Sequence, residues 1–175
     1  MTLPNVFLVG PMGAGKSAVG RQLAKMLRRE FFDSDAEIEA RTGVDIAFIF
    51  EKEGEAGFRR RERDVIQALT AHEDIVLATG GGAVLDAKNR AALASRGLVV
   101  YLQASVEQQL ERTRLSTTRP LLETPDPAGR LAQLMRDREP LYRELATFTI
   151  ATDGRVVRDV AQEVRRVLKT LEKEI

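Results

Sequence analysis

The 175-residue sequence contains no cysteine and only one histidine, His72. A chain without cysteine can form neither disulfides nor thiolate metal sites, which is typical of a protein of the reducing cytoplasm. His72 has no histidine or cysteine near it in the sequence and follows a helical pattern. We therefore expect His72 at the surface and predict no catalytic role for it.

Long hydrophobic runs are also missing. No segment approaches the roughly 18 apolar residues of a membrane span. The N-terminal "MTLPNVFLVG" has neither the charged n-region nor the long apolar h-region of a signal peptide. These features predict a cytoplasmic protein without a membrane anchor.

The charges of the two signs nearly cancel. Lysine and arginine total 27 and aspartate and glutamate 26, for a formal net charge of +1. Such a chain has no global field to attract nucleic acid, so any anion binding must be local. With 43% hydrophobic and 30% charged residues, the composition is typical of one globular domain. We predict a single domain over residues 1–175 that is monomeric and binds no nucleic acid.

Short apolar patterns alternate with amphipathic ones along the chain. Strands are predicted at 5–10, 30–35, 74–80, 97–103 and 147–152. Apolar residues recur three or four positions apart in the intervening and closing segments, at 16–27, 63–71, 87–95, 105–114, 129–145 and 155–175. Strands separated by helices predict an α/β fold of three layers, with a central parallel sheet of about five strands and helices on both faces.

The first strand leads into a phosphate-binding motif. Residues 10–17, "GPMGAGKS", match G-x-x-x-x-G-K-[ST] between a strand and a helix, which is the P-loop signature. Backbone amides and the positive end of the helix would hold the phosphates, Lys16 would reach the β- and γ-phosphates, and Ser17 would ligate Mg²⁺. We therefore predict ATP and Mg²⁺ as ligands. The predicted ATP contacts in this segment are Gly13, Ala14, Gly15, Lys16, Ser17 and Ala18.

Acidic residues and glycines are expected at the same edge of the sheet. Asp33 and Asp35 end the second predicted strand, and "TGGG", residues 79–82, ends the third. Ligands of parallel sheets bind at this carboxyl edge. The spacing of two puts both carboxylates on one side of an extended segment, where they can hold magnesium and orient a phosphoryl acceptor. Asp35 could instead only cap the helix that follows, and the glycines could form an ordinary flexible loop.

The segment "GFRRRERD", residues 57–64, carries four arginines within five positions. On a helix, its apolar stripe leaves Arg60 in solvent and puts Arg59 and Arg61 on the two flanks. Glu62 falls within the apolar stripe, where a carboxylate is costly unless it is paired. Because Arg59 lies three residues earlier, it is placed to pair with Glu62. The run therefore predicts one arginine held rigidly beside the buried face and does not favour a nucleic-acid patch.

Six segments of the chain, in this order, resemble the shikimate kinase family of P-loop kinases. They are "GPMGAGKS", "DSD", "IFEKEGEAGFRRRE", "TGGGAV", "TTRPLL" and "RDREPLY". The resemblance implies phosphoryl transfer from ATP to the 3-hydroxyl of shikimate in aromatic amino acid biosynthesis, with Mg²⁺ near Asp33. It also implies a substrate-binding region at about 33–62. The implied shikimate contacts are Asp35, Arg59, Gly81 and Arg138.

The resemblance also accounts for an insert without periodicity at 114–129, a length that in a compact domain indicates either function or disorder. It implies a mobile lid over about 112–127, whose Arg119 closes on the phosphates. Arg112 matches a residue that packs near adenine, and Arg155 a nucleotide contact. The implied catalytic residues are Lys16, Asp35, as base or orienter of the attacking hydroxyl, and Arg119.

Two alternatives share much of this pattern. A kinase for gluconate or for a nucleoside monophosphate would have the same P-loop and lid, and only its acceptor pocket would differ. A nucleotide-dependent regulatory module could have kept the fold and lost turnover. Each implied catalytic position nevertheless carries the residue type that the family has there, which favours an enzyme.

Overall fold

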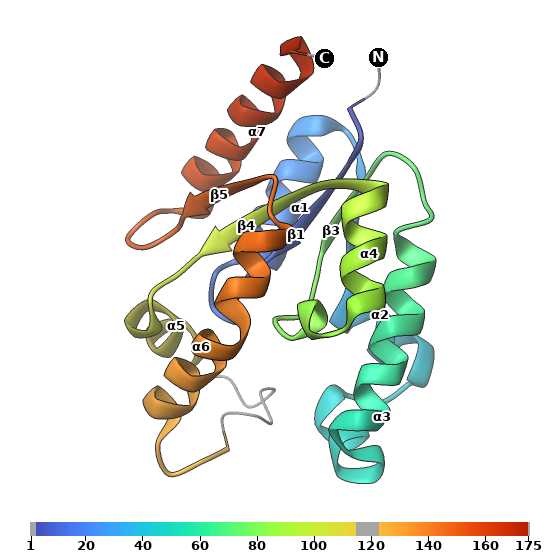
Figure 1. Cartoon of the computed structure of the whole chain (residues 1–175), viewed down its shortest axis with the longest axis vertical. Coiled ribbons are helices and arrows are strands. Elements are labelled where there is room, and N and C mark those ends of the chain that lie inside the picture. The colour runs from blue at the N-terminus through green and yellow to red at the C-terminus, as the bar shows by residue number, and fades with distance from the viewer. Residues whose placement is uncertain (1–2, 115–122, 175) are drawn as a thin grey trace.

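The structure is a computed structural model that describes residues 3–114 and 123–174. Its centre is a parallel sheet of five strands in the order β2-β3-β1-β4-β5 (Figure 1). The strands are β1 (Asn5–Val9), β2 (Glu30–Asp33), β3 (Ile75–Ala78), β4 (Gly97–Gln103) and β5 (Phe148–Ala151). In the central strand, Phe7 is in register with Leu77 of β3 and Val99 of β4. The predicted α/β class and its parallel sheet of about five strands are confirmed.

Helices connect the strands and overlap the six segments of helical period, although the segment 63–71 belongs to a longer helix that begins at Ile46. In the described ranges they are α1 (Lys16–Leu27), α2 (Ser34–Thr42), α3 (Ile46–Leu69), α4 (Ala87–Arg96), α5 (Val106–Thr113), α6 (Pro127–Leu145) and α7 (Val157–Glu174). A 3₁₀ turn, η1 (Ala83–Leu85), follows the glycines after β3. None of the helices in these ranges combines the length and the apolar character needed to cross a membrane.

The two faces of the sheet pack against different helices. Val6 and Leu8 of β1 belong to a buried cluster with α1 and α7, whereas Phe7 and Val9 belong to a second cluster with α2, α3, α4 and α6. This alternation follows from the two-residue period of a strand. Figure 1 shows α3, α4 and α6 together on one side of the sheet. The predicted three layers, with helices on both faces, are therefore confirmed.

The second strand is shorter than the sequence predicts. It ends at Asp33, and α2 begins at Ser34. Asp33 is the N-cap of α2, because its carboxylate accepts a hydrogen bond from the amide of Ala36 at 3.0 Å. Asp35 is therefore in the first helical turn, and the alternative in which Asp35 is the cap is wrong. The expectation that both carboxylates project from one extended segment is wrong for the same reason.

Helix α3 contains a break that the sequence patterns did not reveal. Gly54 adopts φ 70° and ψ −179°, which separates a first half, Ile46–Glu53, from the half that carries the arginine run. This conformation favours glycine, because a Cβ is strained at positive φ. Asp45 caps the first half by accepting from the amide of Phe48 at 2.8 Å. The break brings a further apolar segment to the sheet edge, where it contributes to the site.

Candidate functional site

The P-loop follows β1 and ends in the first turn of α1. Gly15 is the N-cap of α1 with φ 89°, a left-handed conformation that a residue with a side chain rarely adopts. Lys16 is buried, and its Nζ donates to the carbonyl oxygens of Gly10 at 2.7 Å and Pro11 at 2.8 Å. The ammonium group thus lies against the same loop whose amides are predicted to hold a phosphate. The loop therefore combines a fixed cation with the positive end of a helix.

A cavity of about 310 Å³ lies beside this loop, and we call it the P-loop cavity. Its lining residues are Met12, Gly13, Gly15, Lys16, Ser17, Ala18, Arg21, Asp33, Asp35, Thr79, Gly80, Gly81 and Arg112. Arg112 also donates to the carbonyl oxygen of Gly13 at 2.8 Å, which ties α5 to the loop. Most of the residues predicted to contact ATP thus come together here, and Ala14 is buried beside them.

Two predicted nucleotide contacts do not join this group. Arg155 lines neither this cavity nor the one described next, and its guanidinium donates to Ala151 and forms an ion pair with Glu163 at 2.5 Å. Arg119 lies outside the described residues, as do positions 115–122 of the predicted lid.

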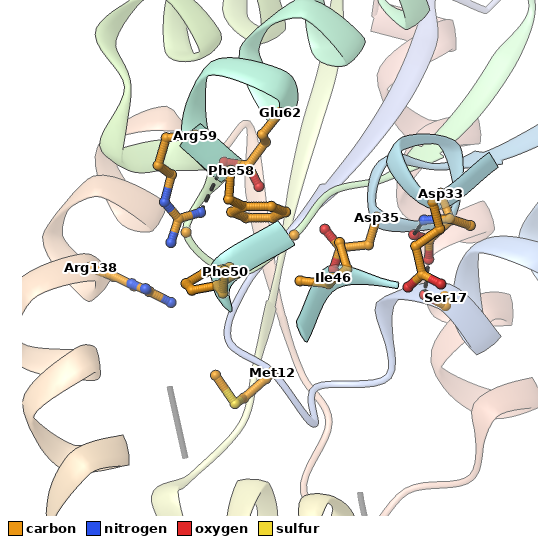
Figure 2. A pocket seen from close by; sticks show the side chains of 15 residues that line it. Met12, Ser17, Asp33, Asp35, Ile46, Phe50, Phe58, Arg59, Glu62 and Arg138 are labelled. Atoms are coloured by element: carbon orange, nitrogen blue, oxygen red, sulfur yellow. Dashed lines mark hydrogen bonds and ion pairs between the residues drawn. The ribbon is translucent and has the colours of Figure 1, made fainter. Parts of the chain in front are cut away.

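A second cavity, of about 390 Å³, adjoins the first, and we call it the arginine cavity (Figure 2). In Figure 2, Arg59 and Arg138 lie on one side of it and Asp35, Asp33 and Ser17 on the other. The two cavities share a wall. The residues that line both are Met12, Ser17, Asp33, Asp35, Gly80 and Gly81. A molecule in the arginine cavity would therefore have direct access to a phosphate held by the P-loop.

Apolar side chains lie between the charged sides of the arginine cavity. Ile46 and Phe50 come from the first half of α3 and Phe58 from its second half, and Figure 2 shows them between Arg59 and Asp35. The ring centroids of Phe50 and Phe58 are 4.9 Å apart. The sequence patterns did not single out Ile46 and Phe50 as residues of the site. The apolar run "IAFIF" with Gly54 after it was the available signal for a separate helical segment.

Arg59 forms the ion pair that the sequence predicts. Its Nη1 donates to Oε1 of Glu62 at 2.9 Å, and its Nη2 donates to Glu55 at 3.2 Å. Burial lowers the pKa of Arg59, but the two carboxylates outweigh burial, so the net direction is upward. Burial also raises the pKa of Glu62 to about 7, although Arg59 opposes that shift. The guanidinium therefore keeps its charge, while Glu62 holds it at the edge of the cavity.

The other arginines of the run have different partners. Arg60 is exposed, as predicted. Arg61 pairs with Glu53 at 2.7 Å. The side chain of Arg63 is 38% exposed and forms an ion pair with Asp86 at 2.6 Å. Since none of these three lines either cavity, the structure separates Arg59 from its neighbours in the run.

Arg138 of α6 is the second cation of the arginine cavity. It is only 4% exposed, and within the described ranges no carboxylate oxygen lies within 4.0 Å of its guanidinium. Burial lowers the pKa of Arg138, and the neighbouring charge of Arg59 also lowers it. Both effects reflect the cost of placing two cations close together in a poorly solvated site. A bound anion would reduce that cost, so this side of the cavity is suited to a carboxylate.

Two glycines after β3 let charged side chains approach the backbone closely. A Cβ on Gly82 would lie 2.3 Å from Nη2 of Arg59, and a Cβ on Gly80 would lie 2.8 Å from Oδ1 of Asp35 and 2.9 Å from Oε2 of Glu62. These distances are too short for real contacts. Glycine is therefore required at both positions because functional side chains occupy the space that a Cβ would fill. This close approach explains the two glycines without the alternative of an ordinary flexible loop.

The opposite side of the arginine cavity combines a hydroxyl with carboxylates. The Ser17 hydroxyl donates to Oδ2 of Asp33, at the wall that the two cavities share. Asp35 lies next to Asp33 on this wall, one residue into α2 (Figure 2). The wall therefore presents oxygen ligands of the kind that Mg²⁺ prefers and, beside them, a carboxylate that can accept a proton.

Comparisons with known proteins agree with this arrangement. A family model described as shikimate kinase matches residues 12–169. A curated relative from Methylococcus capsulatus, named shikimate kinase, is 59% identical over 97% of this chain and 93% of its own length. A solved structure of shikimate kinase from Acinetobacter baumannii in complex with shikimate has a TM-score of 0.95 and 54% identity, covering 97% of this chain and 94% of that one.

A more distant solved structure, a gluconokinase from Sinorhizobium meliloti, covers 98% of this chain and 97% of its own. Its TM-score is 0.59 and its identity 17%, so it shares the fold alone.

Proposed function

Because the chain belongs to the shikimate kinase family and is an ATP-dependent kinase, we propose that the P-loop cavity binds ATP and the arginine cavity binds shikimate. In this assignment Arg59 and Arg138 hold the shikimate carboxylate, and the backbone of Gly81 contributes to the same contact. The apolar side chains between the arginines and Asp35 fit the face of a carbon ring. The 3-hydroxyl of shikimate then lies at the wall that the two cavities share.

The reaction is a direct transfer between the two substrates. The oxygen of the 3-hydroxyl forms a bond to the γ-phosphorus, the bond from that phosphorus to the β–γ bridging oxygen breaks, and ADP leaves. Asp35 orients the hydroxyl and takes its proton. Phosphoryl transfer requires mainly positioning and neutralisation of charge, so Lys16 offsets the negative charge on the transferring group. Arg119 of the predicted lid would add a second cation there.

The residues present fit a magnesium site. The hydroxyl of Ser17 and the carboxylate of Asp33 are in contact at the edge of the P-loop cavity. Mg²⁺ in phosphoryl-transfer enzymes is held by one or two such protein oxygens together with the substrate phosphates. When bound, Mg²⁺ would neutralise charge on the β- and γ-phosphates. Ser17 and Asp33 are the residues that would hold it.

The wider organisation of the enzyme is part of the same proposal. We treat residues 1–175 as a single domain that is active as a monomer, with nucleotide contacts from Gly13 to Ala18 and at Arg112. Arg155 is kept as a peripheral nucleotide contact, although it lines neither cavity. The need for ATP supports a cytoplasmic location.

One observation carries the assignment of the two cavities. Asp35 lines both of them, so one carboxylate faces the P-loop on one side and the two arginines on the other. A nucleotide-binding module without turnover would not require a carboxylate between two ligand cavities. A gluconate kinase would also bind an acid, but it would have to accommodate a flexible chain on the apolar side chains that suit a ring.

A coupled assay of ADP release tests the proposed function. We expect ADP release with shikimate and at most background release with gluconate or AMP, because only shikimate combines a carboxylate with a rigid ring. The methyl ester of shikimate serves as the matched control, since it lacks the charge that Arg59 and Arg138 would bind, and we expect its KM to be roughly 100-fold higher. ATP binding without shikimate-dependent ADP release would refute the assignment.

Gly82→Ala is expected to impair shikimate binding through Arg59. Gly82 has φ −96° and ψ 5°, so alanine introduces no left-handed strain, but its Cβ would overlap the Arg59 guanidinium. A displacement of about 1 Å at a positioning group can cost on the order of 100-fold in rate. We expect kcat/KM for shikimate to fall by roughly that factor, with the KM for ATP unchanged, as measured by steady-state kinetics.

A double-mutant cycle isolates the cause of this loss. If the overlap with Arg59 is responsible, Gly82→Ala should add little to the loss already caused by Arg59→Ala. Fully additive losses would mean that the glycine acts in another way.

A further inference from the structure

The two cations of the arginine cavity are held by different kinds of partner. Arg59 is held by the carboxylates of Glu62 and Glu55. Arg138 has no such partner within 4.0 Å in the described part of the chain, yet it is 4% exposed. A long side chain without an anchor would lose more conformational entropy on gripping a substrate. The question is what fixes the direction of its guanidinium.

Tyr142 is placed to fix the direction of the Arg138 guanidinium. It follows Arg138 by four residues on α6, which puts both side chains on one face of the helix. Its hydroxyl donates to the carbonyl oxygen of Gly81. The Arg138 guanidinium lies beside the same glycine, since a Cβ on Gly81 would be 3.4 Å from Nη1 of Arg138. Burial lowers the pKa of Arg138, and the neighbouring Tyr142 opposes that shift. Tyr142 is fully buried and does not line the arginine cavity. It therefore bonds one proposed shikimate-binding residue and lies close to another, without facing the substrate.

The hydroxyl also helps to fix the glycine turn. The carbonyl of Gly80 accepts a hydrogen bond from the amide of Ala83 at 3.1 Å, and the carbonyl of Gly81 accepts from Tyr142. Both peptide units that flank the Gly81 α-carbon are thereby held in place. The Gly81 amide, which belongs to the first of these units, keeps its direction as a result.

The ring of Tyr142 is itself supported from the sheet. It stacks on Tyr101 of β4 with centroids 5.1 Å apart and planes 22° apart, and both rings are fully buried. Tyr101 in turn donates its own hydroxyl to Glu139 and not to the site. Tyr101 of the central sheet thus supports the ring of Tyr142, whose hydroxyl bonds Gly81 beside Arg138.

We infer, on the basis of the proposed function, that Tyr142 is a positioning residue that aims the Arg138 guanidinium and the Gly81 peptide at the shikimate carboxylate. A phenol suits this task better than a carboxylate would. A carboxylate beside Arg138 would compete with the substrate carboxylate for the hydrogen-bond donors of its guanidinium. The neutral phenol fixes the direction of Arg138 and leaves its positive charge available to the substrate.

Tyr142→Phe tests the inference, with Tyr101→Phe as the matched control. Each substitution removes one hydroxyl from one of two stacked, fully buried tyrosines, but only the Tyr142 hydroxyl bonds Gly81, beside which Arg138 lies. We expect Tyr142→Phe to raise the KM for shikimate roughly tenfold or more, with kcat reduced by less than about threefold and the KM for ATP unchanged. Tyr101→Phe should leave all three constants within about twofold.

A second measurement follows Arg138 directly in the protein without substrate. NMR of the arginine side chains, assigned with Arg138→Lys, reports hydrogen exchange of the guanidinium protons. We expect exchange at Arg138 to be at least about tenfold faster in Tyr142→Phe than in the wild-type protein or in Tyr101→Phe. Equal effects of the two substitutions on the shikimate KM and on exchange would overturn the inference, because they would indicate a general loss of packing.

The two readouts separate this inference from the proposed function. If the wild-type enzyme releases no ADP with shikimate, the proposed function fails, and guanidinium exchange alone decides the role of Tyr142. Faster exchange in Tyr142→Phe would then still support the positioning role, and unchanged exchange would overturn it.

Discussion

Asp35→Asn is expected to reduce kcat by roughly 100- to 10,000-fold, the range that a positioned acid or base contributes. Asparagine keeps the size of the side chain and can still accept a hydrogen bond through its amide oxygen, but it cannot take the proton of the attacking hydroxyl. The dissociation constants of shikimate and ATP should therefore stay within about threefold of the wild-type values. Because product release can mask a slower chemical step, single-turnover rates are the measurement of choice.

Glu39→Gln provides the matched control for this experiment. Glu39 is a second carboxylate of α2 that lines the arginine cavity, but it does not line the P-loop cavity as Asp35 does. Its removal should change the single-turnover rate by less than about threefold. A similar loss in both variants would indicate that the total negative charge of the cavity matters and not a proton acceptor at Asp35. A near-normal rate in Asp35→Asn with intact binding would disprove the proposed role.

Local sequence patterns were sufficient to predict the parts of the site that depend on neighbouring residues. The P-loop is a continuous segment between a strand and a helix, so its motif specifies both its conformation and the position of Lys16. The contact between Arg59 and Glu62 is likewise local, because three residues separate them on one helix. The helical wheel therefore sufficed to predict the pair, and with it the difference between Arg59 and the exposed Arg60.

The sequence could not predict features that depend on the boundaries of elements or on distant contacts. Asp33 and Asp35 share a site because α2 starts between them, not because they alternate along a strand. The positions of Ile46 and Phe50 depend on the break at Gly54, and a glycine within a helical pattern does not by itself show that the chain changes direction there. The bond from Tyr142 to Gly81 joins residues 61 positions apart, so only the tertiary structure brings them together.

Arg59→Ala is expected to lower kcat/KM for shikimate by roughly 30- to 5,000-fold, since truncating one partner of a buried charge pair typically costs about 2–5 kcal/mol. Part of the loss is the missing contact with the substrate carboxylate. Another part arises in the protein itself, because Glu62 is only 1% exposed and would lose the cation that holds it. Arg60→Ala removes an adjacent but exposed arginine and should change kcat/KM by less than about twofold.

The pH dependence of stability separates the missing contact with the substrate from the loss of the cation beside Glu62. Burial raises the pKa of Glu62 to about 7 in the folded protein from 4.5, so the folded state binds this proton more tightly than the unfolded chain does. The free energy of unfolding that Glu62 contributes is therefore present below pH 4.5 and is lost as the pH rises through about 7. Arg59 opposes this shift, so its removal should raise the pKa further and extend the loss to higher pH. Denaturant unfolding should thus find Arg59→Ala increasingly destabilised relative to wild type above pH 7, and Arg60→Ala unchanged.

The double variant Arg59→Ala/Glu62→Gln completes the argument for a substrate clamp. Glutamine carries no charge, so the double variant has no buried, unpaired carboxylate at position 62. We therefore expect it to be more stable than Arg59→Ala at pH 8 and to lack the fall in stability above pH 7. Shikimate affinity should nevertheless remain low, because the guanidinium that would bind the carboxylate is still missing. If the double variant instead recovered wild-type kcat/KM, Arg59 would matter only as the counter-ion of Glu62, and the shikimate carboxylate would have to be bound by Arg138 and the Gly81 backbone without it.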